Sequence, residues 1–305
     1  MNSSTFSFKN WIRIFFLTWM GLLALFFGLS ECLIRMKVSP DDSFEKHRNL
    51  FFNSDKSNAV FGDSHGAQDF MGRQDFINLS FPSESVDIIA AKIKLYFSSR
   101  RMEKVILQAD PHMFSEYRIK ENVNDYIRLF EDPRQPLLQI LTPRHRKYLL
   151  FYWKALISGR GFKSKFRVNP DGSQTIEDRE AGTEQETPKD FDLQTRVRLQ
   201  KPQENFEKSV SVKNYQTMLQ DLKERQAQVC LVTFPVSPEY AGEAARFPDF
   251  EKARNFFQAM AAQYGFSYVN YWNSLQDPHL FRNDDHLNVQ GAKALTQRMV
   301  NDCYA

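Results

Sequence analysis

The feature that most limits the fold is an alternation of short apolar runs with longer amphipathic segments after residue 56. Helical spacing of apolar residues predicts helices over 83–99, 214–228, 249–265 and 288–303, with Gly265 as an expected C-terminal cap. Apolar runs predict strands at 58–62, 75–81, 104–109, 229–236 and 267–271. Strands that alternate with helices predict a parallel sheet with helices covering its faces.

An apolar segment from Trp11 to Ile34 precedes this domain. The stretch between Arg13 and Glu31 carries no charge. It is long enough for one transmembrane helix if these two side chains reach the interfaces. A cleaved signal peptide remains an alternative, although no A-x-A site follows. Basic residues flank both ends of the segment, so they do not decide its orientation. A large domain after a short tail favours an extracytoplasmic location, periplasmic or at the cell surface.

The chain is therefore expected to have three parts. Residues 1–37 form a tail and membrane anchor, residues 38–56 a polar linker, and residues 57–305 an α/β domain with a helical and polar insertion at about 122–210. In the insertion, the segment 144–158, "RHRKYLLFYWKALIS", predicts a helix that either packs as a cap or contacts the membrane surface. The stretch 159–210 is polar and rich in turn residues.

Charge and cysteine content exclude several classes of function. The 40 basic and 37 acidic residues leave a net charge of +3, which does not favour nucleic acid as a partner. Cys32, Cys230 and Cys303 show neither C-x-x-C nor zinc-type spacing, so we expect no disulfide framework and no metal. One bridge, Cys230 to Cys303, stays possible in an oxidising compartment, the alternative being that Cys230 is a core residue.

Two motifs at opposite ends of the domain carry candidate chemistry. The first, Gly62-Asp63-Ser64-His65-Gly66, follows the first predicted strand and makes Ser64 a candidate nucleophile. It fits both the G-x-S-x-G elbow of α/β-hydrolases and a G-D-S motif. His65 is expected to be a residue of the helix N-terminus rather than a base. The second motif, "FRNDDHLNVQGA" at 281–292, places acidic residues and a histidine just before the last predicted helix.

This order of motifs resembles the SGNH (GDSL-type) hydrolase and acyltransferase superfamily. In α/β-hydrolases the acid and the histidine lie on separate loops, whereas here they are together. The resemblance runs from about residue 56 to 302, outside the insertions, and "DDHLNVQGAKALT" is most similar to membrane-anchored members, including relatives of the teichoic acid D-alanyl transfer protein and the alginate O-acetyltransferases. It implies a flavodoxin-like three-layer α/β/α sandwich whose site lies at the carboxyl ends of the parallel strands.

The resemblance also implies roles for individual residues. Ser64 would attack an acyl donor, His286 would act as base and then acid, and Asp284 would orient His286. Asn283 stands where many relatives have aspartate, so Asp285 and Asn283 are alternatives to Asp284.

The expected oxyanion and acceptor sites are less regular. In "NLSFPSES", Ser80 or Ser83 replaces the family glycine, and Asp110 stands where an asparagine would donate a hydrogen bond. We expect the oxyanion hole to consist of the Ser64 N–H and a backbone N–H near Ser83. Tyr240, in "FPVSPEY", is expected to line the acceptor site, with a structural turn as the alternative.

These patterns predict a membrane-anchored serine O-acyltransferase or esterase that acts on a cell-surface polysaccharide or envelope polymer. No cofactor is expected; the expected partners are the membrane, a membrane-bound acyltransferase as acyl source, and the glycan or polymer acceptor. The alternative is a catalytically silent SGNH-like scaffold in a polysaccharide or envelope assembly complex.

Overall fold

The computed structural model describes residues 8–119, 123–132, 137–159, 162, 164, 166–176 and 192–304. The chain divides into two compact units, which are described separately. One comprises Met1–Lys46 and Arg134–Ser164, and the other comprises His47–Pro133 and Lys165–Ala305.

The larger unit is built around a five-stranded parallel sheet. Its order is β2 (Ile77–Asn78), β1 (Ala59–Phe61), β3 (Lys104–Gln108), β6 (Gln228–Thr233) and β7 (Ser267–Asn270). Counted along the chain this is the order 2-1-3-4-5 of flavodoxin-like sheets. The central strands are buried on both faces, which explains why they are continuous apolar runs. The expected parallel α/β/α sandwich is confirmed.

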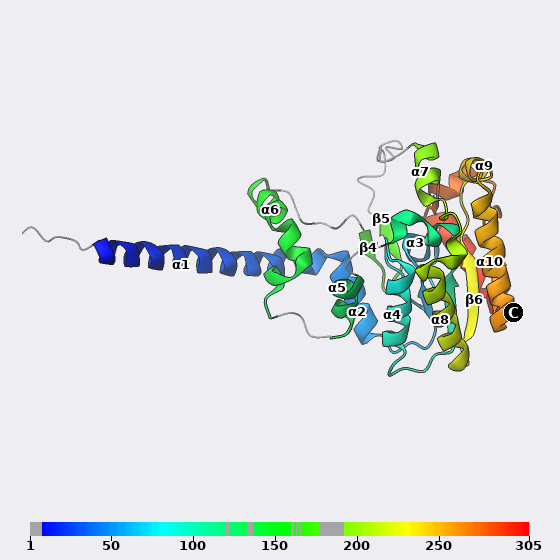
Figure 1. Cartoon of the computed structure of the whole chain (residues 1–305), viewed down its shortest axis with the longest axis horizontal. Coiled ribbons are helices and arrows are strands. Elements are labelled where there is room, and N and C mark those ends of the chain that lie inside the picture. The colour runs from blue at the N-terminus through cyan, green and yellow to red at the C-terminus, as the bar shows by residue number, and fades with distance from the viewer. Residues whose placement is uncertain are drawn as a thin grey trace, which may run out of the picture. The chain divides into compact units, whose positions relative to one another are not determined.

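Helices cover both faces of this sheet. On one face, α3 (Ser64–Asp69) and α11 (Val289–Tyr304) border a core that includes Val60, Ile106 and Met299. On the other lie α4 (Val86–Tyr96), α8 (Val210–Glu224) and α10 (Pro248–Tyr264). Figure 1 shows α8 and α10 beside β6. Gly265 caps α10 with a φ of 76°, as its place in the sequence predicts.

The remaining elements of this unit lie between or after the sheet strands. They are α5 (Val123–Ile127), the antiparallel pair β4 (Phe166–Val168) and β5 (Gln174–Ile176), α7 (Leu193–Gln200), α9 (Pro238–Ala244), and the antiparallel pair β8 (Phe281–Asn283) and β9 (His286–Leu287). The predicted polar insertion thus contains a hairpin and a helix. Its residues 177–191 lie outside the described residues.

The segment 38–56 differs from the expected linker. It contains helix α2 (Ser43–Asn53), and within the larger unit Phe51 is buried against Tyr96 and Phe130. His47 is also buried, 3.0 Å from the ammonium of Lys92. The composition of this segment indicates a polar linker because charged side chains lie between the apolar residues of the helix.

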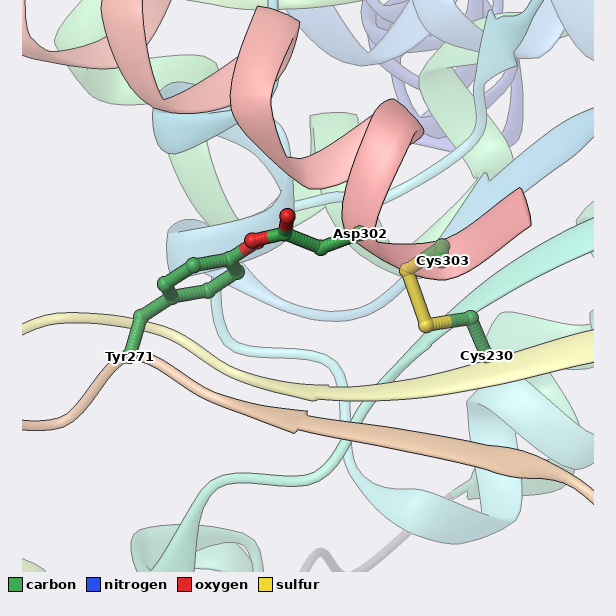
Figure 2. The surroundings of a disulfide bond; sticks show 4 residues. All are labelled: Cys230, Tyr271, Asp302 and Cys303. Carbon is green, nitrogen blue, oxygen red and sulfur yellow. A yellow bond between two sulfur atoms is a disulfide. The ribbon is translucent and has the colours of Figure 1, made fainter. Parts of the chain in front are cut away.

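A disulfide bond joins the sheet to the last helix. Cys230 of β6 and Cys303 of α11 are bridged, with their Cα atoms 5.6 Å apart (Figure 2). Near it, the Tyr271 hydroxyl donates to the Asp302 carboxylate at 2.7 Å, so the chain after β7 is also tied to α11. Of the two alternatives for Cys230, the structure has the bridged one.

The smaller unit contains α1 (Phe8–Leu33), α6 (Pro143–Ile157) and the start of α2. At 1.5 Å per residue the 26 residues of α1 are about 39 Å long, against about 30 Å for the hydrocarbon core of a bilayer. The helical stretch Asn10–Asp41 has a mean hydropathy of 2.0 in its most apolar window, none of which is buried. By length and composition it can span a membrane.

Candidate active site

The first motif lies where β1 turns into α3. Ser64 is the first residue of α3 and is partly exposed; Asp63 precedes it as the N-cap and accepts the His65 N–H at 3.0 Å. Among the residues that the structure describes, none forms a hydrogen bond with the Ser64 hydroxyl. Ser64 is therefore held by its backbone alone, at the carboxyl edge of the sheet.

Gly62 is required by the close approach of a neighbouring strand. A Cβ atom at this position would lie 2.3 Å from Gln108 Oε1 and 2.9 Å from Gln108 Cβ. That approach lets Gln108 Oε1 accept the Asp63 N–H at 2.6 Å while its amide donates to the carboxylates of Asp63 and Asp110. The glycine of the motif thus allows β3 to fix the residue before Ser64.

Asp63 is a buried carboxylate that side chains from distant parts of the chain contact. His112 Nε2 lies 2.7 Å from its Oδ2, and the Arg118 guanidinium donates to the same oxygen. Burial alone would raise the pKa of Asp63, but Arg118 and His112 outweigh it and hold the pKa well below its usual range. Asp63 is therefore ionised at neutral pH and anchors the turn that carries Ser64.

The second motif forms a tight hairpin in which Asn283 pairs with His286. His286 Nδ1 lies 3.0 Å from Asp285 Oδ1 and 3.2 Å from Asn283 Oδ1, so we assign its proton to Nδ1. Its Nε2 is buried and has no hydrogen-bond partner in the described part of the chain. Burial lowers the pKa of His286 to about 4, although Asp285 opposes the shift. At neutral pH the ring is neutral, with a free lone pair on Nε2.

The carboxylate that contacts His286 belongs to Asp285, one of the two alternatives, whereas the sequence predicts Asp284 in this role. Asp285 is buried and also accepts from Arg196 at 2.8 Å and from Gln200 at 2.7 Å. Burial opposes its ionisation, but His286 and His65 hold its pKa well below the usual range. The Asp284 side chain is 37% exposed, and its nearest cation is Arg196 Nε at 3.9 Å. Burial raises the pKa of Asp284.

His65 connects the two motifs. Its Nδ1 lies 2.7 Å from Asp110 Oδ2 and its Nε2 lies 3.9 Å from Asp285 Oδ2. Burial lowers its pKa, but Asp110 and then Asp285 reverse the shift and raise the pKa well above its usual value. Its ring also meets the ring of His286 edge to face, with centroids 4.8 Å apart. His65 is therefore a buried cation between two carboxylates, a larger role than that of a helix N-terminal residue.

Further contacts hold the second motif beside α3. The Leu287 N–H donates to Asp69 at 3.0 Å, and Arg282 donates to Gln68 at 2.8 Å. Because Ser64 begins α3 and His286 begins β9, these bonds bring both motifs to one edge of the sheet. Within the described residues no hydrogen bond joins Ser64 to His286, and the reactive atoms of both are without a partner.

The three secondary candidates have different surroundings. Ser83 is exposed and has a φ of 67°, the left-handed conformation that favours glycine. The Asp110 carboxylate accepts from Phe234 N–H, Gln108 and His65, so it holds the site and donates to nothing. The Tyr240 side chain is buried and donates to Gln200 instead of lining an open surface, which corrects the expected acceptor contact.

Among the residues whose placement the structure describes, two groups of side chains have the atoms to ligate a metal. They are Asp63, His65 and His112, and His65, Asp285 and His286. Arg118 occupies the first group and Arg196 the second, so a cation would compete with a guanidinium in each. The expectation that the protein uses no metal stays a prediction.

Sequence reasoning missed Arg118, Arg196 and Gln200. Arg118 lies in a short helical turn after β3, and the other two lie on α7 inside the predicted insertion. Each is far in sequence from the acid that it contacts, and polar residues in a polar segment give no pattern that marks them as part of a site. The sequence Asp-Pro-His, which occurs at 110–112 and again at 277–279, is the one signal that could have marked His112.

Comparisons with known proteins add little. No family model and no curated protein sequence matches this chain. Among solved structures, it is similar to a protein from Streptococcus pneumonia assigned as a platelet activating factor, with 11% identity and a TM-score of 0.44, covering 94% of this chain and 99% of that one. It is also similar to a protein from Bacteroides fragilis assigned as an acylhydrolase, with 10% identity and a TM-score of 0.41, covering 84% and 95%. Likeness at this level assigns no family or activity.

Proposed function

We propose that the protein is a membrane-anchored serine esterase or O-acyltransferase that acts on a cell-surface polysaccharide or another envelope polymer. One observation carries the proposal. An ionised, buried Asp285 holds the proton of His286 on Nδ1. Within the described part of the chain, Nε2 is then without a hydrogen-bond partner, at the sheet edge where the Ser64 hydroxyl also lies without one. Nucleophile, base and orienting acid are the parts that acyl transfer through serine requires.

In the proposed first step, Ser64 Oγ bonds to the carbonyl carbon of the acyl donor while His286 Nε2 takes the hydroxyl proton. The bond to the donor's leaving oxygen then breaks, and His286 returns the proton to that oxygen. In the second step a sugar hydroxyl, or water, gives its proton to His286 and attacks the acyl-serine, and Ser64 regains its proton. Asp285 stabilises the imidazolium in both steps.

The disulfide supports the proposed location. Structural disulfides persist in oxidising compartments, and Cys230 and Cys303 are bridged in the larger unit. With α1 as the anchor, this favours a domain held outside the cytoplasm. A tethered enzyme gains from an acyl source in the same membrane, because tethering raises the effective concentration of the two partners. We therefore propose a membrane-bound acyltransferase as the partner that supplies the acyl group.

A labelling experiment tests the chemistry. The full-length protein in detergent is treated with a fluorophosphonate, which reacts with activated serines. We expect one label at Ser64, its loss in Ser64→Ala, and no change in the matched variant Ser98→Ala, whose serine is exposed on the same unit. Acceptor-dependent turnover of a small acyl ester then separates transfer from hydrolysis.

The silent scaffold remains a second candidate, because the described residues provide no hydrogen bond that would activate the Ser64 hydroxyl. A protein in which Ser64 takes no label, and in which Ser64→Ala keeps full polymer modification in the cell, would be such a scaffold.

A further inference from the structure

Helix α6 of the smaller unit exposes large apolar side chains. Leu150 is 82% exposed, Phe151 63% and Ile157 83%. Just before α6, Leu141 is 57% exposed. These residues are not on the inner face of the helix, which is formed by the buried side chains of His145, Tyr152 and Ala155. The outer face therefore presents hydrocarbon to its surroundings.

The same face also carries positive charge. Arg146, Lys147 and Lys154 are exposed among the apolar side chains of α6. Apolar residues mixed with Lys and Arg on one exposed face are typical of helices that lie at the boundary of lipid headgroups and acyl chains. The aliphatic stems of the basic side chains can then lie along the acyl region while their charges reach the headgroups.

Contacts with α1 show where α6 lies along the segment that can span the membrane. The Trp153 indole stacks on Phe26, with ring centroids 6.0 Å apart, and its Nε1 donates to Ser30 at 3.0 Å. Phe26 and Ser30 are in the last turns of the uncharged stretch of α1. Trp153 therefore lies level with the end of the segment that can span the membrane.

The basic start of α6 lies farther from that segment. The Arg144 guanidinium pairs with the Asp42 carboxylate, which follows α1 by nine residues. From Arg144 to Trp153, α6 thus runs back along the chain toward the apolar part of α1. In addition, the Glu31 carboxylate accepts the N–H groups of Gln139 and Ile140, which fixes the turn before α6 to the end of α1.

We propose that α6 is a second membrane contact, which inserts its exposed apolar side chains into the boundary of an anionic bilayer beside α1. Arg146, Lys147 and Lys154 bind the anionic headgroups. The inference rests on the membrane anchoring given under the proposed function. It goes beyond that anchoring, because it assigns a lipid-binding face to a helix from the predicted insertion.

Spin labels on the full-length protein test this contact. In a Cys32→Ser background that keeps the disulfide, single cysteines replace Leu150 or Ile157 and carry a nitroxide. The protein is reconstituted into vesicles of phosphatidylcholine and phosphatidylglycerol, and power saturation measures collisions with oxygen, which enriches in lipid, and with a water-soluble nickel chelate. Leu22→Cys in α1 reports the anchor. Val210→Cys, 68% exposed on α8, is the matched aqueous control.

We expect the labels at Leu150 and Ile157 to have oxygen-to-nickel ratios several-fold above that at Val210 but below that at Leu22, which lies near the middle of the uncharged stretch of α1. A ratio like that of Val210, with a lipid-like Leu22, overturns the lipid contact and leaves the anchor intact. Low collision rates with both reagents indicate a protein contact, such as a second copy, and also overturn it. If the label at Leu22 has a ratio as low as that at Val210, both the membrane anchor and the lipid contact of α6 are overturned.

Charge reversal tests the headgroup assignment. The variant Arg146→Glu with Lys147→Glu, labelled at Leu150, should show a lower oxygen-to-nickel ratio than the same label without the charge changes. An unchanged ratio would overturn the role of anionic headgroups.

Discussion

Replacing Asp285 by asparagine is the sharpest test of the site, because it keeps the shape of the side chain and removes its charge. In comparable triads, an asparagine in place of the orienting acid costs about 10⁴ in rate. Here Asn283 Oδ1 lies 3.2 Å from His286 Nδ1 and can still accept its proton. We therefore expect Asp285→Asn to lower the turnover of a small ester by about 10²- to 10⁴-fold, or about 3–5 kcal/mol of activation free energy.

The same substitution should also change stability and pH dependence. Arg196 and His65 lose a buried anion, and breaking a buried pair costs about 3–5 kcal/mol. Because the Asp285 carboxylate raises the pKa of His286, its loss should move that pKa below about 4. The acidic limb of kcat/KM should then shift to lower pH, an effect that a simple loss of packing would not produce.

The assay is hydrolysis of p-nitrophenyl acetate by the full-length protein, at temperatures below the unfolding transition measured by circular dichroism. Asp284→Asn is the matched control: it removes the same charge one residue earlier, from a side chain that is 37% exposed. Exposed pairs contribute about 0–1 kcal/mol, so we expect at most about a fivefold effect on rate. A larger loss in folded Asp284→Asn than in folded Asp285→Asn would refute the assignment of the orienting acid.

Four further predictions concern the larger unit. Since His286 acts as a base only when it is neutral, kcat/KM of the wild type should decrease when the pH is lowered below about 4. The contribution of His286 to the free energy of unfolding should be complete above pH 6.5 and decrease as the pH falls toward 4, which urea titrations across that range would measure. Ser83→Gly should raise the unfolding free energy, because glycine adopts a φ of 67° without strain; an unchanged or lower urea midpoint would contradict this. Replacing Cys230 and Cys303 by alanine should lower the unfolding free energy by about 4 kcal/mol, because the bridge closes a loop of 73 residues, and a loss under about 1 kcal/mol would contradict the chain-entropy account.

The central strands of the sheet were predictable because they are buried on both faces and are therefore mainly apolar. The run 104–109 illustrates this, since Val105, Ile106 and Leu107 are all buried in β3. Helix α2 was not predictable in the same way. Phe44 and Phe51 are buried, but charged neighbours dominate its composition, and the buried His47 depends on Lys92 from a distant helix. Lys92 comes close to His47 only in the folded chain, so a local sequence pattern does not show this contact.

The choice between the two neighbouring acids shows where sequence reasoning must stop. Asn283 and His286 pair across a hairpin, so Asp284 and Asp285 form its two-residue turn, and either carboxylate could have faced the imidazole. A carboxylate is buried only where cations and donors compensate its lost hydration. Arg196 and Gln200 of α7 supply them to Asp285, and α7 belongs to an insertion that the motif itself does not describe. The orienting acid is therefore selected by a helix some 85–89 residues earlier in the chain, and the hairpin sequence alone cannot contain that information.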